Sequence, residues 1–294
     1  MPELPEVETL ARDLQELLVG AEICDVEICW FRTVALPTVD ELTEQLPGRS
    51  VVNVRRRGKF LVIGLSDGTY LLIHLRMSGQ LRVEVASCSP DGHVRAIFRL
   101  ADGRRLVFSD TRKFGRVYWT KDPRDVTGDL GPEPLAEGFS LQDFAAALTR
   151  RRGAVKPLLL NQQFLAGLGN IYTDEALFDA GLHPLRKADS LSAEEVERLY
   201  RAIRMVLSQA IANRGTTLQD ERYLDAQGWP GAYGERLRVY GRVGEPCPRC
   251  GEPIERIVVG GRGTHVCTQC QDYSPPSSDM AFTPGCREQG MASH

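Results

Sequence analysis

The sequence predicts an α+β fold: an N-terminal helix plus an antiparallel β-sandwich domain, followed by a helical domain with a cysteine-flanked β-hairpin. Three observations support this prediction. Apolar residues recur every three or four positions over residues 3–19, alternate in short runs over 23–119, and return to helical spacing after residue 135. A length of 294 residues allows one or two domains with their own cores.

The first expected element is an amphipathic helix from Glu3 to Val19. Its apolar residues lie three and four positions apart, which places them on one stripe, and Gly20 ends the helix. Pro2 stands at or just before the first turn, where its missing N–H has no cost.

Residues 23–119 then predict short, largely antiparallel strands. After residue 50 these cover 51–57, 60–65, 69–75, 80–85, 94–100, 104–109 and 115–119, with Asp-Gly turns at 67–68, 91–92 and 102–103. In an earlier strand Cys24, Val26 and Ile28 alternate onto one face, so Cys24 is expected to be a small core residue.

Helices are expected after a linker that is rich in glycine and proline, at residues 128–135. Ser140 is an expected N-cap, and Ser192 forms a capping box with Glu195 that opens a helix to about Asn213.

Two shorter helices, 156–166 and 171–180, are expected on either side of the sequence GLGN at 167–170. A glycine-containing turn between helices exposes backbone N–H groups that suit a phosphate. Helical hairpins are also common as packing units, so this pattern by itself is a weak signal and leaves both interpretations open.

Four cysteines with paired spacing predict a structural zinc site. Cys247 and Cys250 precede Cys267 and Cys270 by sixteen residues, and four thiolates complete the coordination of the metal. The zinc should therefore hold the hairpin 251–266, with Arg262 near its tip, rather than take part in chemistry. A disulfide is disfavoured because we recognise no secretory signal.

The formal charge of −3 hides a strong segregation of charge. Residues 1–48 contain eleven carboxylates and two arginines, whereas residues 49–116 contain fourteen lysines and arginines and five carboxylates. A basic segment of this kind can steer a polyanion, although solvated strand edges would explain it equally well. Composition excludes collagen-like and disordered chains, and no apolar run approaches the length of a membrane span.

The N-terminus is a candidate reactive group. Removal of Met1 before the small Pro2 would leave a secondary amine beside the positive end of a helix, which favours the neutral, nucleophilic form. Attack of this amine on an aldehyde carbon gives a lasting iminium cation that promotes β-elimination, and Glu3 can act as the general acid/base. The alternative is that Pro-Glu simply starts a helix well.

Seven ordered motifs resemble bacterial formamidopyrimidine-DNA glycosylase over residues 2 to about 271. They read MPELPEVET, HLRMSG, DTRKFGR, LGPEPL, AVKPLLLNQ, GLGNIY, and VYGRVGEPC followed by RGTHVCTQCQ. The resemblance implies a bifunctional DNA repair glycosylase/AP lyase that excises oxidised purines, chiefly 8-oxoguanine and formamidopyrimidines, and cuts the strand by β,δ-elimination. It also implies a catalytic β-sandwich domain at 1–130, a helix-two-turn-helix (H2TH) domain at 131–235 and a zinc finger at 236–271. Residues 272–294 depart from the family pattern, and their polar composition, rich in serine and proline, predicts a disordered tail.

The same resemblance implies the roles of individual residues. Pro2 would be the Schiff-base nucleophile, Glu3 the proton donor and acceptor at the sugar, and Lys59 an aid to base release that follows a phosphate-binding arginine triplet. Arg262 would bind the phosphates that flank the lesion and assist δ-elimination. Met77, Arg112 and Phe114 would fill the void that an extruded base leaves. The residues expected to bind backbone phosphates are His74, His93, Arg151, Lys156 and Asn170.

Two other functions are kept as alternatives. An endonuclease VIII-type enzyme would use the same proline and glutamate to remove oxidised pyrimidines, but Leu4, Met77 and the DTRKFGR loop favour the purine enzyme. A non-catalytic zinc-finger protein that binds damaged DNA would need no free Pro2. We expect one zinc ion as the sole cofactor, double-stranded DNA with oxidised bases or abasic sites as the partner, no membrane association, a monomer, and a bacterial cytoplasmic location.

Overall fold

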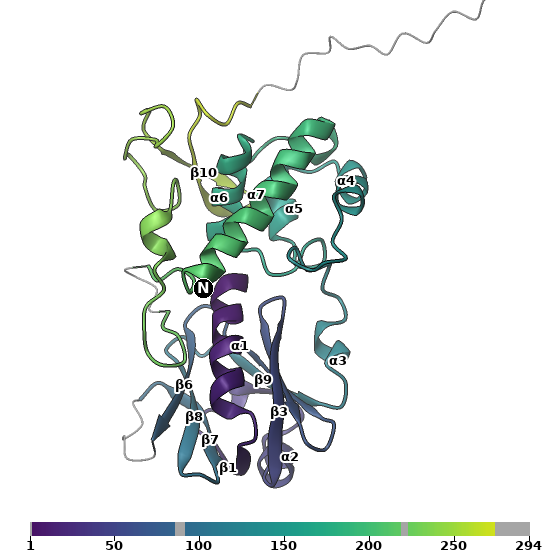
Figure 1. The fold of residues 1–294 in the computed structure, drawn as a ribbon, viewed down its shortest axis with the longest axis vertical. Helices are drawn as coiled ribbons and strands as arrows, with labels where there is room; N and C mark the ends of the chain where they lie inside the picture. The colour runs from purple at the N-terminus through teal and green to yellow at the C-terminus, as the bar shows by residue number, and fades with distance from the viewer. Residues whose placement is uncertain (1, 86–91, 219–222, 274–294) are drawn as a thin grey trace, which may run out of the picture.

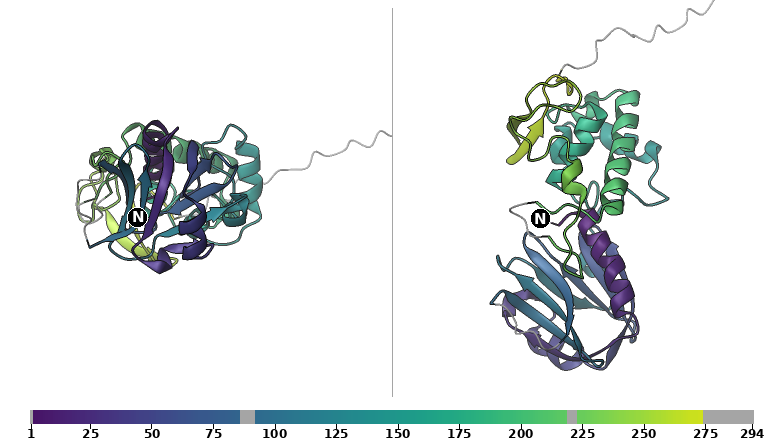
Figure 2. Two further views of the ribbon diagram at one scale, coloured as in Figure 1. Left: turned by 90° about the horizontal axis from the view of Figure 1, so that it is seen from below. Right: turned by 60° about the vertical axis from the view of Figure 1, so that its left-hand side comes forward.

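The computed structural model describes residues 2–85, 92–218 and 223–273, and it consists of two halves stacked along the longest axis of the molecule (Figure 1). One half contains the large β-sheet, and the other contains the helices that follow residue 140 together with a C-terminal hairpin. Helix α1 (Leu4–Leu18) begins at the junction of the halves and runs along the β half (Figures 1 and 2).

The β half is a sheet folded into two layers. Its described strands are hydrogen-bonded in the order β2-β9-β5-β4-β3-β1-β7-β8-β6. Strands β1 and β3 pair only at Glu22–Ser50 and Ile23–Arg49, and the two layers meet there. The strand bounds are β1 (Glu22–Ile28), β2 (Val34–Leu36), β3 (Arg49–Arg57), β4 (Phe60–Leu65), β5 (Tyr70–His74), β6 (Gly79–Val85), β7 (Val94–Leu100), β8 (Arg104–Asp110) and β9 (Arg116–Thr120).

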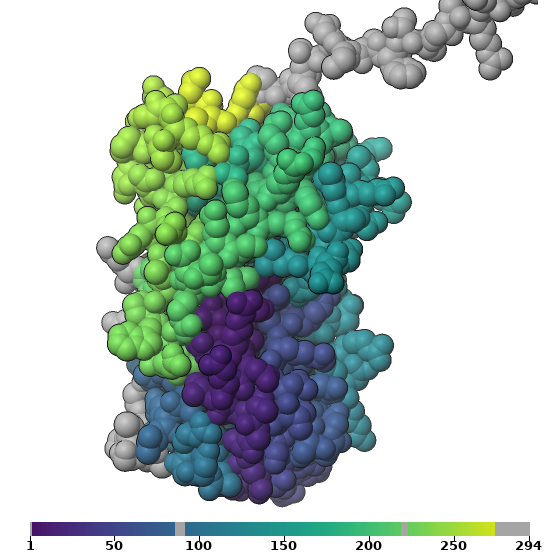
Figure 3. All heavy atoms as spheres, viewed as in Figure 1, coloured from purple at the N-terminus to yellow at the C-terminus, as the bar shows by residue number. Residues whose placement is uncertain are grey.

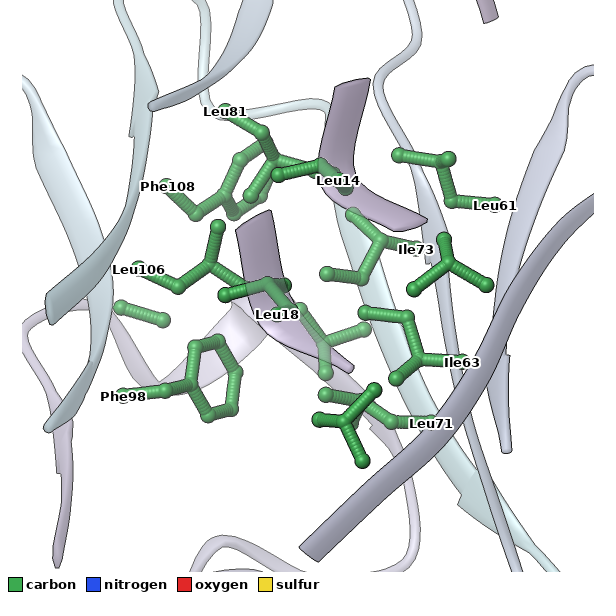
Figure 4. Close-up of a cluster of buried hydrophobic side chains, with 14 of the residues drawn as sticks. Leu14, Leu18, Leu61, Ile63, Leu71, Ile73, Leu81, Phe98, Leu106 and Phe108 are labelled. Carbon is green, nitrogen blue, oxygen red and sulfur yellow. The ribbon is translucent and has the colours of Figure 1, made fainter. Parts of the chain in front are cut away.

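Every strand pair of this sheet is antiparallel in the described chain except β2 with β9. Leu14 and Leu18 of α1 lie between the layers, with Phe98 and Phe108 on one side and Ile73 on the other (Figure 4). This buried apolar interface accounts for the stability of the half, and it confirms the expected helix plus antiparallel sandwich.

Cys24 corrects the prediction for the first strand. Its side chain is exposed, whereas Ile23 and Val26 are buried. The register between β1 and β7 shifts between Ile23 and Asp25, and this bulge reverses which side chains face the core. Simple alternation therefore assigned Cys24 to the wrong face.

The helical half has a separate core. Its helices are α4 (Leu141–Thr149), α5 (Val155–Leu160), α6 (Asn170–Ala180) and α7 (Ala193–Ala212). Ser140 caps α4 and Ser192 caps α7 through the expected capping box with Glu195. Helix α5 is shorter than predicted, because turns occupy residues 162–167. Leu4 of α1 belongs to this core, so α1 connects the two halves.

Short elements complete the fold. They are α2 (Val39–Gln45), α3 (Arg124–Thr127), the 3₁₀ turns η1 (Phe31–Thr33), η2 (Ala188–Ser190) and η3 (Tyr233–Arg236), and the hairpin strands β10 (Glu255–Val259) and β11 (Arg262–Val266). The predicted linker at 128–135 lies between α3 and α4. Of the helices in the described ranges, none combines the length and apolar character needed to cross a bilayer.

Candidate active site between the two halves

A cavity of about 820 Å³ lies where the halves meet. Its lining includes Glu3 beside α1, Lys59 from the β3–β4 turn, Met77 before β6, Asn170 of α6 and Arg262 of β11. Because these residues come from distant segments, the cavity forms only when both halves pack together. In the space-filling view the N-terminal segment runs down the β half, and its upper end abuts the helical half (Figure 3).

The carboxylate of Glu3 lies at the N-terminal end of α6. It accepts hydrogen bonds from the backbone N–H groups of Gly169 (2.7 Å), Ile171 (2.9 Å) and Tyr172 (3.4 Å). A Cβ at Gly169 would lie 2.3 Å from Cδ of Glu3, so glycine makes room for this contact. The N–H groups that the GLGN pattern offered to a phosphate therefore hold an internal carboxylate, which corrects that interpretation.

The same glycine turn anchors the beginning of α1. The N–H of Leu4 donates to the carbonyl of Gly167 at 3.0 Å, and Gly167 has a φ of +94°. A Cβ there would lie 2.6 Å from the Leu4 side chain. Pro2, which is buried, is thereby held next to the fixed Glu3 carboxylate.

Burial shifts the protonation of the two ionisable groups in the cavity. It raises the pKa of Glu3 to about 7, against the opposing charge of Lys59 and with the help of the nearby Glu6. Burial lowers the pKa of Lys59, and the charges of Glu3 and Glu6 oppose that change. Near neutral pH Glu3 therefore populates both its acid and its base form, as a general acid/base requires.

Glu6 is a buried site residue that the sequence analysis missed. Its carboxylate accepts from the N–H of Glu3 (2.7 Å), the N–H of Thr216 (2.7 Å) and the hydroxyl of Tyr172. Burial raises the pKa of Glu6. The available signal was the polar series Glu6, Thr9 and Asp13, which follows helical spacing beside the apolar stripe and is buried.

Lys59 follows Gly58 in a two-residue turn whose shape needs the positive φ of +57° at Gly58. The N–H of Gly58 donates to Glu133 at 2.6 Å, and Glu133 also accepts from Arg56 (2.6 Å) and Arg57 (3.0 Å). These contacts correct the expected phosphate-binding arginine triplet, because two of its members bind an internal carboxylate. They join the Lys59 turn to the segment between the halves.

His74 is buried and faces the cavity without a charge. Burial, aided by Arg76 and Lys59, lowers its pKa to about 3. Its Nδ1 accepts from the N–H of Arg76 at 3.0 Å, so the ring proton resides on Nε2. His74 can therefore donate a hydrogen bond to a phosphate oxygen but cannot neutralise it.

The three expected void-filling residues occupy two loops of the β half. Met77 is 39% exposed and Phe114 is 49% exposed, which is unusual for side chains of this size. Both line the cavity, and the guanidinium of Arg112 lies 5.3 Å from the ring centre of Phe114. The structure thus brings together an apolar pair and an adjacent arginine at the mouth of the cavity.

Lys156 departs from its expected role. It is fully buried and pairs with the equally buried Asp174 at 2.6 Å. Its Nζ also donates to Thr264 Oγ1 (2.8 Å) and to the carbonyl of Gly263 (3.3 Å). The side chain therefore joins the helical half to the hairpin and does not reach a phosphate. Asn170 donates to the same Gly263 carbonyl at 2.9 Å while lining the cavity.

Two other expected phosphate ligands lie outside the cavity lining. Arg151 is exposed just after α4. His93 is exposed just before β7, and its carbonyl accepts from the N–H of Asp110 at 2.8 Å. Neither residue lines the cavity, and His93 lies close to the loop of Arg112.

The four predicted zinc ligands converge. The sulfur atoms of Cys247, Cys250, Cys267 and Cys270 all lie within 4.8 Å of one another. Tetrahedral Zn–S bonds of about 2.3 Å separate sulfur atoms by about 3.8 Å, and the Cys247–Cys270 and Cys250–Cys267 pairs lie at 3.8 and 3.5 Å. The four thiolates fit one structural zinc ion, which would fix the hairpin that carries the exposed Arg262.

Family models match three consecutive parts of the chain. The formamidopyrimidine-DNA glycosylase N-terminal domain matches residues 1–117, its H2TH domain matches 130–222, and the zinc finger found in FPG and IleRS matches 244–272. The formamidopyrimidine-DNA glycosylase of Herpetosiphon aurantiacus is 46% identical over 276 residues, with 92% of this chain and 100% of that protein covered.

Solved structures agree with these matches. The Lactococcus lactis Fpg bound to N7-benzyl-Fapy-dG DNA has a TM-score of 0.86 and 36% identity, covering 92% of this chain and 100% of that one. The same protein bound to DNA with an abasic site has a TM-score of 0.86 and 35% identity, covering 92% and 99%. The chain therefore belongs to the formamidopyrimidine-DNA glycosylase family.

Proposed function

We propose that this DNA repair glycosylase excises oxidised purines from duplex DNA and then cuts the abasic strand by β,δ-elimination. The observation that carries the proposal is the position of Glu3, whose buried carboxylate has a pKa of about 7 and lies next to Pro2 in a cavity shared with Lys59. The L. lactis relative has been crystallised with formamidopyrimidine-containing DNA and also with DNA that contains an oxidised pyrimidine, which supports damaged duplex DNA as the substrate. The choice of purines is favoured by Leu4, Met77 and the DTRKFGR loop.

The chemistry begins with the free amine of Pro2. Its nitrogen bonds to C1′ of the damaged nucleotide while the glycosidic bond breaks, and the base departs with that electron pair and with the proton that the Pro2 nitrogen loses. Protonated Glu3 gives its proton to the sugar ring oxygen as the ring opens, which leaves an iminium between Pro2 and C1′. Lys59 supports base release through its ammonium group.

Strand cleavage follows from the iminium. It acidifies the C2′ proton, and loss of that proton to the Glu3 carboxylate breaks the C3′–O bond. A further proton loss breaks the C5′–O bond, with the guanidinium of Arg262 on the departing phosphate. Water then hydrolyses the iminium and frees Pro2. These steps transfer protons and exchange C–N and C–O bonds without a net oxidation or reduction, so they need no redox partner.

DNA would lie across the cavity, in contact with residues of both halves. Met77 and Phe114 would enter the stack at the position of the extruded base, and Arg112 would hydrogen-bond the orphaned partner base. His74, His93 and Asn170 would donate to backbone phosphates. We also propose a monomer that acts in the cytoplasm, with domain boundaries near residues 130 and 235.

Borohydride trapping tests the covalent step. We expect reduction to link the protein to an oligonucleotide with 8-oxoguanine opposite cytosine, after intact mass has confirmed removal of Met1. A variant with an N-terminal extension that blocks Pro2 is the control, and it should bind the duplex without trapping. Failure of the processed protein to trap would refute the proposal. Binding of the damaged duplex without trapping or cleavage, by the processed and the blocked protein alike, would favour the non-catalytic alternative.

Substrate choice is tested separately. Single-turnover excision of 8-oxoguanine and of thymine glycol, in otherwise identical duplexes, separates the purine enzyme from the endonuclease VIII-type alternative. We expect faster excision of 8-oxoguanine. A product gel then distinguishes β- from β,δ-elimination.

A further inference from the structure

The two loops that carry the void-filling residues are joined through one buried carboxylate, that of Asp110 at the end of β8. Its Oδ1 accepts from the Ser78 hydroxyl, next to Met77, and from the N–H of Arg112 at 3.1 Å. Its Oδ2 accepts from the N–H of Gly115 at 2.7 Å. One side chain therefore spans both loops.

Asp110 is buried inside the protein and is not exposed at the surface that would contact DNA. It is 1% exposed, and no lysine, arginine or histidine in the described parts of the chain forms an ion pair with its carboxylate. Two of its donors are the backbone N–H groups of Arg112 and Gly115, so the carboxylate fixes the backbone of the loop between β8 and β9. The Ser78 hydroxyl also accepts from the N–H of Arg112 at 3.2 Å, which closes the link between the loops.

Close packing on either side leaves the loops little freedom. A Cβ at Gly115 would lie 2.3 Å from the ring of Phe108 and 3.2 Å from Oδ2 of Asp110. A Cβ at Gly79 would lie 2.4 Å from the carbonyl of Leu75. Arg95 holds the backbone carbonyl of Asp110 at 2.8 Å from the opposite side.

We propose that Asp110 is a positioning residue that couples the two loops, so that Met77 enters DNA together with Arg112 and Phe114 as one preformed unit. This inference rests on the proposed function of those three residues. Separate, flexible loops would have to lose conformational entropy at the moment of insertion, whereas a preformed unit has already done so. Asp110 touches no substrate and acts only through the loops.

A consequence distinguishes this role from a purely structural one. Extrusion of a stacked, paired 8-oxoguanine needs the inserted unit, whereas a preformed abasic site has no base to unstack. Loss of Asp110 should therefore slow base excision much more than cleavage of an abasic site. A general loss of folding would reduce both activities equally.

The test compares Asp110→Asn with wild type. Asparagine keeps the size and one acceptor oxygen but replaces the other acceptor by an NH2 group, so the N–H of either Gly115 or Arg112 loses its partner. We expect single-turnover excision of 8-oxoguanine to fall by about 10- to 100-fold, the effect of losing a hydrogen bond to a charged group, and abasic-site cleavage to change less than about threefold. Fluorescence of 2-aminopurine beside the lesion should show less unstacking.

Asp102→Asn is the matched control. Asp102 accepts from the N–H of Arg104 at 3.0 Å in the exposed turn between β7 and β8, at the other end of β8 from Asp110. This variant should excise and cleave like wild type.

Ser78→Ala provides a second route if Asp110→Asn fails to fold. This variant removes the hydroxyl that links the loops but retains both backbone contacts of Asp110. We therefore expect a smaller loss of 8-oxoguanine excision than in Asp110→Asn, again with little change in abasic-site cleavage. Equal losses on both substrates, or wild-type excision by both variants, would overturn the inference. Inactivity of wild type on every substrate would instead overturn the proposed function.

Discussion

The buried pair of Lys156 and Asp174 gives the sharpest test of how this site is built. The family pattern places Lys156 on a DNA phosphate, whereas the structure encloses its ammonium between Asp174 and Thr264. These two positions predict different measurements. An internal lysine supports the folded state, and a phosphate ligand supports DNA binding.

The size of the stability effect follows from the burial of both partners, each 0% exposed. Removal of one member of such a pair leaves an uncompensated buried charge and costs about 3–5 kcal/mol. For a cooperatively unfolding domain of about 150–250 residues, this loss of unfolding free energy corresponds to a fall in Tm of about 6–20 °C. Lys156→Met and Asp174→Asn should each show this loss.

The double variant Lys156→Met/Asp174→Asn is the control. It removes both charges, yet the asparagine oxygen can still accept from the N–H of His265, which Asp174 Oδ2 binds at 2.9 Å. We expect it to regain at least half of the lost stability. Burial lowers the pKa of Lys156 and Asp174 opposes this change, so the loss in Asp174→Asn should shrink as pH rises and the lysine becomes neutral.

Thermal unfolding and DNA binding at several salt concentrations complete the assay. A lysine that neutralises a phosphate contributes about 0.9 to the slope of log affinity against log salt concentration. We expect Lys156→Met to lower Tm and leave that slope unchanged. A slope reduced by about 0.9 with an unaltered Tm would show that our assignment of Lys156 is wrong.

Four further predictions concern the site. Above pH 7 the rate of base excision should decline about tenfold per pH unit, because Glu3 with a pKa of about 7 loses the proton that it must donate. Any residual excision by Glu3→Gln should not show this decline. Gly169→Ala should reduce single-turnover excision at least about 100-fold, because its Cβ displaces Glu3, whereas Gly153→Ala, whose Cβ meets nothing within 4 Å, should match wild type. Chelation of zinc should abolish cleavage and melt the hairpin, as judged by metal content and circular dichroism, while zinc restores both. Arg76→Ala should reduce the salt slope of DNA binding by about 0.9, and Arg99→Ala should leave it unchanged.

Elements with local signals were predicted well from the sequence. The strands follow apolar alternation and Asp-Gly turns, helix α7 follows its capping box, and the zinc ligands follow a spacing contained in one short segment. Each of these sequence patterns lies within, or a few residues from, the element that it predicts. The bulge that exposes Cys24 has no such signal, because a register shift depends on the partner strand.

Site geometry was predicted less well, because its partners are far apart in the chain. The backbone donors that bind the Glu3 carboxylate lie 166 to 169 positions away in the sequence, and the bonded pair Arg56 and Glu133 is separated by 77 positions. Sequence patterns can name such residues but cannot pair them. The GLGN turn shows this: its glycines indicated a binding turn, but only the packed structure shows that the bound anion is the carboxylate of Glu3.

The charge pattern illustrates the same point and indicates where DNA binds. Much of the basic segment 49–116 is neutralised internally, for example Arg56 by Glu8 and Arg99 by Asp25 and Glu27 of the acidic N-terminal segment. Some lysines and arginines of the basic segment have no carboxylate within 4.0 Å in the described residues. They include Lys59, Arg76 and Arg116, which line the cavity, and Arg112 and Lys113, which lie in the loop between β8 and β9. Attraction of a polyanion depends on charge that remains unpaired and not on the segment total. Most of the cations left after internal pairing lie at the cavity or in this loop, whereas Arg55 lies in a separate hollow beside Tyr70 and Arg124. For this reason loss of Arg76 should weaken the salt response when loss of Arg99 does not.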